Sequence, residues 1–413
     1  MGELLTLILA GGAGERLQPL TRMRTKPAVP FAGKYRLIDF ALSNCINSGA
    51  RNIYVLTQYL SSSLIRHIQE GWNISGARMG DFIYCIQAQQ KIGKEWYLGT
   101  ADAVRQNLDL LVEDYEHVLI LSGDHVYKMN YTRMLEYHKL KDADATIATT
   151  RCTVDEAKYL GVLGIDSDES ILEFEEKPSI PKTIPGNEEY CLTSMGVYIF
   201  RVDILKEILR NDLNDFGRDV FPHLVGGECN LYSYDYTTYN IIKDYQIELK
   251  ENKNVKTLYE KTLDSDYWRD VGNLDSYYQT SMELLKLNPP FNLYGIRWPF
   301  RTYQADLSPG KCVHGGVVED SILCDGCVIR GGQVSSSILS PNVTVEKDSL
   351  IEESIIFDNV VINPGVKIRR VIIDKDVEIS TGITLGYDIQ SDIQKGCIVS
   401  ENGIVVVSKG MHL

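Results

Sequence analysis

The chain has 413 residues, of which 44% are hydrophobic, and its 56 acidic and 42 basic residues give a formal net charge of −14. This length favours two domains with sizeable cores over a single one. The acidic balance excludes a general nucleic-acid binder, so any anionic ligand must be held by a local cluster of cations.

Membrane insertion and secretion are also disfavoured by the sequence. No apolar run approaches the roughly 18 residues that span a bilayer, and the N-terminus has neither the basic region nor the cleavage site of a signal peptide. The nine cysteines are scattered along the chain, which indicates reduced thiols. We therefore expect a cytoplasmic protein with no membrane or nucleic-acid partner.

Strand-like and helix-like segments alternate over residues 1–285. Apolar runs predict strands at 4–10, 51–57 and 117–122, and apolar residues at helical spacing predict helices at 38–49 and 99–111. This rhythm predicts a Rossmann-like α/β domain with a mainly parallel sheet and helices on both faces. Ligands of such sheets bind beyond the carboxyl ends of the strands, where the polar loops after the first and third runs would lie.

The residue pattern changes near Pro289, where a linker rich in proline and aromatic residues occupies 286–312. Helical patterns vanish after it, and apolar residues recur in six-residue steps with Asn, Asp and Gly between them. These steps form four runs: Ile322, Val328 and Val334; Val345, Ile351 and Phe357; Ile362 and Ile368; Ile373, Ile379 and Leu385. The period predicts a parallel β-helix over 313–413, with an ordinary β-sandwich as the alternative.

The first polar loop reads LAGGAGERL over residues 9–17. It fits neither the dinucleotide fingerprint, because Leu17 stands where the last glycine would be, nor the P-loop, which ends in Gly-Lys-Ser/Thr. Its glycines still allow backbone N–H groups to approach an anion closely. Arg16, Arg22, Arg24 and Lys26 lie within eleven residues, which favours a polyphosphate site over a solvated turn.

Two aspartates and a lysine are further candidates for the site. Asp124 ends an apolar strand, where a carboxylate could hold Mg²⁺, and Asp270 in YWRDVG could share the same ion. Each aspartate could equally be a turn or cap residue. Lys177 in FEEKP could bind a phosphate if its strand ends at the cleft, or it could form an ordinary surface ion pair.

Together these motifs resemble the sugar nucleotidyltransferases, and within them the ADP-glucose pyrophosphorylases, also called glucose-1-phosphate adenylyltransferases. The resemblance covers nearly the whole chain, in order, through LAGGAGERL, KPAVPFAGKYRLIDFALSNCINSG, WYLGTADAV, SGDHVYKMNY, FEEKP, SMGVYIF, DFGRD, YWRDVG and ENGIVVV. It implies a catalytic domain at 1–285, a linker at 286–312, and a left-handed β-helix at 313–413 that serves oligomerisation and regulation.

The activity that the resemblance implies is Mg²⁺-dependent transfer of an adenylyl group from ATP to glucose 1-phosphate. The products are ADP-glucose and pyrophosphate, and the reaction commits glucose to glycogen or starch. Members are homotetramers whose activity responds to glycolytic intermediates such as fructose bisphosphate or 3-phosphoglycerate. Because the sugar phosphate is already ionised near neutral pH, catalysis should depend on positioning and charge neutralisation rather than on a general base.

The resemblance also implies roles for individual residues. Arg16, Lys26 and Asp124 are expected to be catalytic, and Asp124 and Asp270 are expected to hold Mg²⁺. Expected contacts of the nucleotide are Leu9, Ala10, Gly11, Gly12, Gly14, Gln87, Gln90 and Gly99. Expected contacts of glucose 1-phosphate are Tyr97, Gly161, Glu176, Lys177, Ser194, Asp219 and Trp268. The effector is expected at Arg24, Lys34 and Arg36.

Some positions depart from the pattern of the bacterial members. Glu15 stands where threonine is common, and it could point away from the triphosphate or pair with Arg24. Gln87 and Lys91 stand where proline and arginine are common, and Leu98 stands where some members carry arginine. These departures concern the response to effectors more than the reaction.

Three alternative functions remain open at this stage. The first is a nucleotidyltransferase that uses UTP, dTTP or glucosamine 1-phosphate. The second is a non-catalytic regulatory subunit, which is disfavoured because the expected catalytic residues are all present. The third is acyl transfer at the β-helix, which is disfavoured because its only histidines, His314 and His412, lie at its margins.

Overall fold

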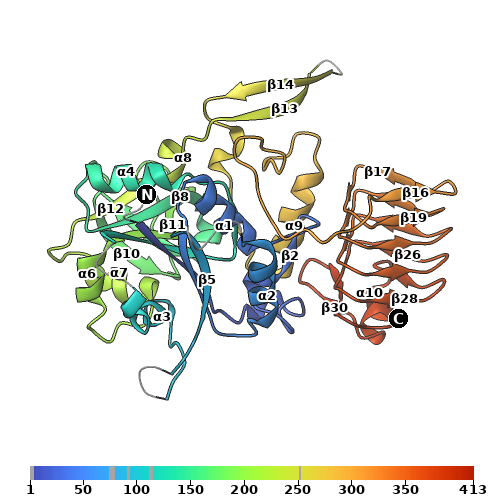
Figure 1. Ribbon diagram of the computed structural model, residues 1–413, viewed down its shortest axis with the longest axis horizontal. Coiled ribbons are helices and arrows are strands. Elements are labelled where there is room, and N and C mark those ends of the chain that lie inside the picture. The colour runs from blue at the N-terminus through green and yellow to red at the C-terminus, as the bar shows by residue number, and fades with distance from the viewer. Residues whose placement is uncertain (1–3, 74–79, 91–93, 111–114, 251–252) are drawn as a thin grey trace.

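The structure is a computed structural model that describes residues 4–73, 80–90, 94–110, 115–250 and 253–413. An α/β domain is followed by a β-helix, and the two lie side by side, with the hairpin of β13 (Asp244–Lys250) and β14 (Lys253–Tyr259) projecting from the first (Figure 1). None of the helices in the described part of the chain has the length and apolar character that a membrane crossing requires.

The α/β domain is built on a nine-stranded sheet with the path β10-β9-β11-β6-β1-β4-β5; in addition, β8 pairs with β11, and β12 pairs with β8. Strands β1, β4, β5 and β6 pair in parallel, and only β10 and β11 oppose the direction of the other described strands of this sheet. The expected mainly parallel sheet is therefore confirmed. The strands are β1 (Leu4–Ala10), β4 (Asn52–Thr57), β5 (Phe82–Gln87), β6 (His117–Ser122), β8 (Ala145–Thr153), β9 (Gly161–Ile165), β10 (Ile171–Glu176), β11 (Tyr190–Arg201) and β12 (Leu231–Asp235).

Helices cover both faces of this sheet, as expected. Leu4 and Ile8 of β1 face one apolar core, which includes residues of α1, α2 and α4, whereas Leu5 and Leu7 face another, which includes residues of α3, α6 and α7. The helices are α1 (Ile38–Asn47), α2 (Ser62–Gly71), α3 (Thr100–Arg105), α4 (Tyr131–Leu140), α5 (Val154–Ala157), α6 (Val202–Ile208), α7 (Phe221–Leu224), α8 (Tyr236–Tyr239), α9 (Leu274–Met282) and α10 (Ile389–Gln394). The helix predicted over 99–111 was too long: α3 ends at Arg105, a separate turn covers Leu108–Leu110, and Leu111 lies outside the described residues.

Three parallel sheets form the three sides of the β-helix, so the β-sandwich alternative was wrong. The first side contains β16 (Lys311–Val313), β19 (Val328–Arg330), β22 (Thr344–Val345), β25 (Val361–Ile362) and β28 (Glu378–Ile379). The second contains β17 (Val317–Glu319), β20 (Gln333–Ser335), β23 (Leu350–Glu352), β26 (Lys367–Arg369) and β29 (Thr384–Leu385). The third contains β18 (Ile322–Leu323), β21 (Ile338–Leu339), β24 (Ile355–Ile356), β27 (Val371–Ile373) and β31 (Val405–Val407), with β30 (Ile398–Val399) antiparallel to the last.

Polar residues with left-handed backbone conformations turn the corners of the β-helix. At one corner Asn342, Asn359 and Asp376 have φ angles of 64°, 61° and 58°. Their side chains form a ladder of hydrogen bonds of 3.0 and 2.9 Å from coil to coil. This explains the Asn, Asp and Gly residues between the apolar steps, because these residue types tolerate left-handed backbone best.

The six-residue spacing is correct for most of the β-helix, but three members were wrong. Leu323, Ile329 and Ile356 pack in the interior core. Val328 is only partly buried, and Ile322 and Phe357 pack toward the α/β domain. Val345, Ile362 and Ile379 lie above one another, and coil-to-coil contacts are typically 17 residues apart. A coil of 17 residues has two sides of six residues and one side of five. The five-residue side interrupts the six-residue spacing of the apolar residues once in each such coil.

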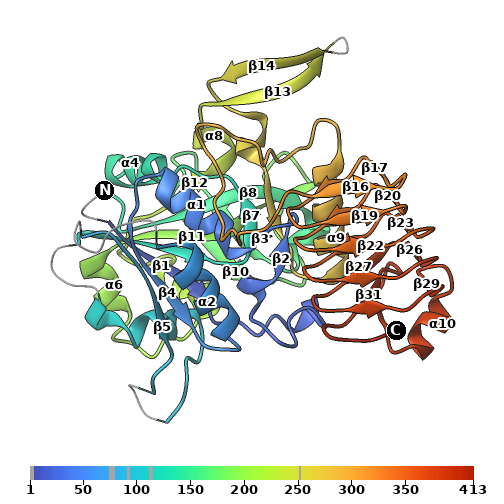
Figure 2. The same cartoon turned by 45° about the vertical axis from the view of Figure 1, so that its right-hand side comes forward.

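The third side of the β-helix is buried on both of its faces. Residues such as Leu339 and Ile373 point into the interior of the β-helix. Their neighbours Ile338 and Ile372 pack in a second core with aromatic residues of the α/β domain, including Phe40. Helix α9 lies beside the β-helix in both views (Figure 1, Figure 2). A side buried on both faces needs consecutive apolar residues, which accounts for the Ile-Leu and Ile-Ile pairs of these strands.

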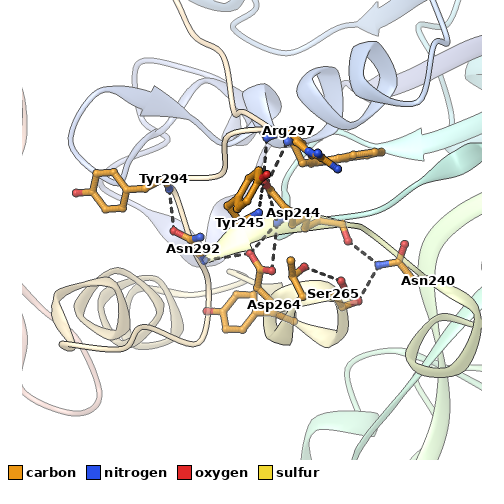
Figure 3. A network of polar contacts seen from close by, with 12 residues as sticks. Asn240, Asp244, Tyr245, Asp264, Ser265, Asn292, Tyr294 and Arg297 are labelled. Atoms are coloured by element: carbon orange, nitrogen blue, oxygen red, sulfur yellow. Dashed lines mark hydrogen bonds and ion pairs between the residues drawn. The ribbon is translucent and has the colours of Figure 1, made fainter. Parts of the chain in front are cut away.

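A buried carboxylate anchors the linker to the α/β domain. Asp244 accepts hydrogen bonds of 2.8–3.2 Å from the backbone N–H groups of residues 296–298 (Figure 3). Its carboxylate also lies 3.7 Å from the ammonium of Lys128, which is paired with Asp264 at 3.2 Å. All three charged side chains are 0–1% exposed. Buried charges are tolerated only when they are paired and hydrogen-bonded, so this network commits the linker to one path.

We expect the Asp244→Ala variant to lose about 3–5 kcal/mol of unfolding free energy, because it leaves Lys128 with one fewer buried partner and the linker amides without an acceptor. Urea denaturation followed by tryptophan fluorescence measures the loss. The matched control is Glu260→Ala, which removes the exposed partner of Lys243 at the base of the same hairpin and should change the value by less than about 0.5 kcal/mol. Equal urea midpoints of unfolding for Asp244→Ala and Glu260→Ala would show that Asp244 does not anchor the linker.

Candidate active site

A cleft of about 790 Å³ opens at the carboxyl ends of β1, β4 and β6. The parallel register places Ala10 opposite Thr57 and Leu9 opposite Ser122, so the loops that follow these strands meet at one edge. The lining includes residues 9–16, Lys26, Gln58, residues 97–100, Asp124, Glu176, Lys177 and residues 215–217. This is the edge at which the sequence predicted ligand binding.

The glycine loop is held in place by two threonines that follow it. Thr25 donates a hydrogen bond to the carbonyl oxygens of Ala10 and Gly12 at 3.2 and 3.3 Å, and Thr21 donates to that of Gly14 at 2.9 Å. Gly14 has a φ of 65°, and a Cβ there would lie 2.9 Å from the Cβ of Lys26. Both the backbone conformation and the close approach therefore require glycine at this position.

Lys26 joins two carboxylates from distant parts of the chain. Its ammonium lies 2.8 Å from Asp124 Oδ2 and 2.9 Å from Asp270 Oδ1. Asp270 reaches this point because β15 (Trp268–Asp270) pairs antiparallel with β7 (His125–Tyr127), with Asp270 opposite His125. The side chain of Lys26 is 10% exposed and those of the two aspartates are 23% and 21% exposed.

Lys26 and its two carboxylate partners stabilise one another's charged forms. Burial alone would lower the pKa of Lys26, but Asp124 and Asp270 outweigh it and hold that pKa above its usual value. Burial alone would raise the pKa of each aspartate, but Lys26 and then His125 outweigh it and hold both carboxyl pKa values below their usual range. Both carboxylates are therefore ionised at neutral pH, with the lysine ammonium as their counter-charge.

The donor set of this cluster fits a divalent cation. Asp124, His125 and Asp270 each present one ligand atom, and these atoms lie within 4.8 Å of one another. Carboxylate oxygens are the hard ligands that Mg²⁺ prefers, and an aspartate pair at a strand edge is partly accessible to solvent. Ser122 also donates a hydrogen bond to Asp124, which orients that carboxylate.

A second group of residues lines the opposite wall of the cleft. Lys177 follows β10 with a φ of 52°, and its ammonium lies 2.8 Å from Glu176 Oε1. Two glycines leave space for the other oxygen of Glu176, because an added Cβ would lie 3.1 Å from it at Gly161 and 2.5 Å from it at Gly217. The side chain of Lys177 is 46% exposed, so its ammonium can reach a ligand in the cleft.

The structure brings together twelve of the residues that the sequence singled out. The cleft is lined by Leu9, Ala10, Gly11, Gly12, Gly14, Arg16, Lys26, Tyr97, Gly99, Asp124, Glu176 and Lys177. Asp270 borders it through Lys26, and Gly161 borders it through Glu176. Their contacts with substrates stay predictions, whereas their convergence from distant segments of the chain is a property of the fold.

Three other expected sugar-phosphate residues lie behind the cleft surface. The Asp219 carboxylate accepts hydrogen bonds from the N–H groups of Asn214 and Asp215 at 2.8 and 2.9 Å, so it shapes the loop that enters the cleft. Trp268 packs edge-on against His125 at 5.1 Å. Ser194 accepts a hydrogen bond of 3.2 Å from the N–H of Gly196.

The two glutamines expected to contact the nucleotide lie outside the lining of the cleft. Gln87 is exposed at the end of β5, and Gln90 donates a hydrogen bond of 2.6 Å to the carbonyl oxygen of Lys94. Lys91 lies outside the described residues. The segment around Gly99 packs tightly against the loop before α7, because a Cβ on Gly99 would lie 2.3 Å from the carbonyl oxygen of Asn214.

The three residues expected to bind an effector lie at the contact between the domains. Arg24 pairs with Asp374 of the β-helix at 2.9 Å, and Arg36 lies 3.7 Å from Asp358. The ammonium of Lys34 lies 5.7 Å from the ring of Tyr35. The suggested pairing of Glu15 with Arg24 was wrong, because Arg24 is committed to Asp374.

Glu15 itself lines the cleft. Its side chain is exposed and forms no ion pair with the described residues.

Sequence reasoning missed several residues of the cleft. Gln58 follows β4 just as the glycine loop follows β1, so the rule about strand ends could have identified it. Residues 215–217 enter the cleft although the motif DFGRD directed attention to Asp219. His125 was quoted as part of SGDHVYKMNY, but only the pairing of β7 with β15 reveals that it faces two carboxylates.

Two family models match the chain, one for each domain. Residues 5–286 match the nucleotidyl transferase family and residues 305–407 match the GlmU-like C-terminal hexapeptide family. The second match agrees with a β-helix of the left-handed hexapeptide type.

Proteins named glucose-1-phosphate adenylyltransferase resemble the chain over its full length. The one from Koribacter versatilis is 43% identical, with 100% of this chain and 97% of the relative covered. A Vibrio vulnificus protein with that name followed by the numeral 1 is 42% identical, with 100% of both chains covered. The one from Rhodopirellula baltica is 40% identical, with 99% and 91% covered.

The ion cluster predicts a distinctive dependence of stability on pH. We expect the Asp124→Asn variant to be less stable than the wild type at neutral pH by about 1–3 kcal/mol, because Lys26 loses a charged partner. A carboxylate whose folded pKa is depressed stabilises the fold above its unfolded pKa of about 3.9, and this contribution is lost as the pH falls toward the folded pKa. The difference between the two proteins, measured by urea denaturation, should therefore shrink below about pH 4.

Glu15→Gln serves as the control for this prediction, since Glu15 is an exposed carboxylate of the same cleft. Its stability should follow that of the wild type within about 0.5 kcal/mol at each pH. A difference between Asp124→Asn and the wild type that grows on acidification would contradict the ion cluster.

Proposed function

The chain belongs to the nucleotidyl transferase family and, within it, to the glucose-1-phosphate adenylyltransferases, and from this we propose that it transfers the adenylyl group of ATP to glucose 1-phosphate. The products are ADP-glucose and pyrophosphate. The observation that carries the proposal is a single cleft that joins a glycine loop, two cations, an aspartate pair and a lysine on the opposite wall.

In this reaction a phosphate oxygen of glucose 1-phosphate attacks the α-phosphorus of ATP in line with the departing pyrophosphate. A new bond forms between that oxygen and the α-phosphorus, and the bond from the α-phosphorus to the bridging oxygen breaks. The attacking phosphate is ionised at neutral pH, so no general base is required. The protein contributes by holding two polyanions in line and by neutralising their charge.

The proposed roles divide between the two walls of the cleft. The backbone N–H groups of residues 11–14 and the side chains of Arg16 and Lys26 hold the triphosphate and stabilise the departing pyrophosphate. Lys177 binds the phosphate of glucose 1-phosphate, and its partner Glu176 orients it and faces the sugar. The cleft lies where these walls meet, which supports an in-line arrangement of the two substrates.

Asp124 and Asp270 are the residues that would hold Mg²⁺. When bound, that ion supplies positive charge to the triphosphate oxygens in addition to that of the side chains. In the structure Lys26 provides the counter-charge for the same carboxylates, at 2.8 and 2.9 Å. The lysine is thereby kept ionised and next to the glycine loop.

We also propose that an anionic effector, a phosphorylated glycolytic intermediate, binds at the contact between the domains. Arg24, Arg36 and Lys375 lie there close to one another, with Asp374 and Asp358 as their ion-pair partners among the described residues. Burial and then the charge of Arg36 lower the pKa of Lys375 to about 8, despite Asp358. An additional anion would offset the repulsion between these cations.

The family relationship further supports a homotetramer in the cytoplasm that supplies ADP-glucose for glycogen or starch. The β-helix provides two sides that are not covered by the α/β domain, and these are available for contacts between subunits.

A panel of substrates tests the reaction directly. Pyrophosphate release should be fastest with ATP and glucose 1-phosphate, and it should be slower by orders of magnitude with UTP, dTTP or glucosamine 1-phosphate. Fructose bisphosphate or 3-phosphoglycerate should change the rate, and the Lys375→Gln variant should respond less than the wild type. A preference for UTP would refute the adenylyl transfer, and absence of turnover with every pair would favour a regulatory subunit.

Lys177→Gln tests the binding of the sugar phosphate. We expect the KM for glucose 1-phosphate to rise about 10–100-fold, because a charge-assisted hydrogen bond to the phosphate is lost, while the KM for ATP changes little. Lys182→Gln is the matched control, since Lys182 pairs with Glu173 of the same strand and more than half of its side chain is exposed. Equal increases in both KM values would indicate a general distortion of the cleft instead.

A further inference from the structure

We propose that His125 is a third ligand of the divalent cation, which makes the site a two-carboxylate, one-imidazole centre that binds Mn²⁺ more tightly than Mg²⁺. This inference rests on the proposed role of Asp124 and Asp270 as ligands of that cation. It adds a nitrogen donor that the motifs in the sequence did not suggest.

The position of His125 follows from the strand pairing. It is adjacent to Asp124 in the chain and lies opposite Asp270 in the β7–β15 ladder. Its Nε2 atom lies 3.5 Å from Asp124 Oδ1 and 3.7 Å from Asp270 Oδ1. Both distances exceed the 2.7–3.2 Å or so of a normal hydrogen bond, so the ring does not bond to either carboxylate.

These spacings suit a shared cation. Two ligand atoms that each lie about 2.1 Å from a cation are about 3.0 Å apart at right angles and about 4.2 Å apart on opposite sides. The separations of 3.5 and 3.7 Å fall between these limits. A cation could therefore contact Nε2 and both carboxylates with small adjustments of the side chains.

The orientation of the ring exposes a lone pair to the carboxylates. Nδ1 lies 3.1 Å from the carbonyl oxygen of Met195. A carbonyl oxygen can only accept, so Nδ1 carries the hydrogen, and in the neutral ring Nε2 is then the unprotonated nitrogen. Histidines that bind metals nearly always donate their other N–H to a carbonyl or carboxylate in this way.

The surrounding residues fix this orientation. The Trp268 ring meets the imidazole edge-on at 5.1 Å between centroids. Gly196, with a φ of 68°, lies so close that a Cβ there would be 3.4 Å from Cε1 of the imidazole. A half-turn of the ring would break the hydrogen bond to Met195. Trp268 thus has a positioning role, although it does not line the cleft.

The nitrogen donor determines which ions the site favours. Imidazole is a common ligand of the transition metals, whereas Mg²⁺ strongly prefers oxygen. Two carboxylates and one imidazole suit Mn²⁺, which accepts both kinds of donor. Lys26 lies between the same carboxylates, so the ion and the lysine ammonium share their charge.

Electron spin-echo spectroscopy of Mn²⁺ tests this ligand directly. The probe is Mn²⁺ with the full-length protein and an ATP analogue that has a methylene group between the α- and β-phosphorus. Protein labelled with ¹⁵N-histidine should show a ¹⁵N coupling in place of the ¹⁴N coupling of unlabelled protein, which separates histidine from the nitrogens of adenine. The comparison needs no variant, so it does not depend on whether one folds.

Variants then assign the signal. His125→Asn should lose the histidine coupling and weaken Mn²⁺ binding by about tenfold or more, with a smaller loss for Mg²⁺. His314→Asn is the matched control, because His314 is exposed in the β-helix and its φ of 51° suits asparagine. It should retain both the coupling and the affinity.

The outcomes separate this inference from the function on which it rests. Mn²⁺ that binds and depends on Asp270 but shows no histidine coupling would overturn the role of His125 and leave the aspartate pair intact. Mn²⁺ that binds no better to the wild type than to Asp270→Asn would overturn the metal site itself. Equal losses of Mn²⁺ and Mg²⁺ affinity in His125→Asn would overturn the preference for Mn²⁺.

Discussion

The ion cluster of Lys26, Asp124 and Asp270 is the constraint on which the rest of the site depends. Residues 244 apart in sequence meet in it, at 2.9 Å. Buried or half-buried charges are costly unless they are paired, so Lys26 cannot move without breaking its ion pairs with both carboxylates. The cluster therefore fixes the segment after the glycine loop, the end of β6 and the strand β15 relative to one another, and with them the floor of the cleft.

The segment that carries Lys26 also connects the cleft to the β-helix. Residues 11–14 line the cleft, while Phe31 and Phe40 belong to the apolar core that is shared with the third side of the β-helix. Arg24 lies between these regions and pairs with Asp374 of the β-helix. A change at the domain contact therefore has a short covalent route to the glycine loop. Close-packed cores do not deform continuously but switch between discrete arrangements. Two alternative packings of this one segment would therefore be enough to couple the domain contact to the glycine loop.

Much of the fold could be predicted from the sequence because its patterns are local. The apolar runs that became β1, β4 and β6 and the six-residue steps of the β-helix report burial directly. The errors have a tertiary origin. Phe357 is as apolar as an interior residue, but the domain contact buries it from outside, and no pattern within the β-helix distinguishes the two kinds of burial. Likewise, the role of Asp244 as an anchor cannot be read from its neighbours in sequence, because the backbone N–H groups that it binds lie about fifty residues later in the linker.

The site shows the same division between local and tertiary signals. The glycine loop and Asp124 follow strands, so position alone indicated them, whereas Asp270 and His125 come together only through the pairing of β7 with β15.

The electrostatic potential of the cleft also depends on tertiary structure more than on composition. The net charge of −14 would repel a triphosphate, and Glu15 adds an acidic side chain to the cleft. Glu15 is exposed, however, and salt screens exposed charges over about 8 Å, while the partly buried Lys26 is screened much less. The charge that a bound anion meets is thus decided by the few cations that the fold buries around it rather than by the sum over the chain.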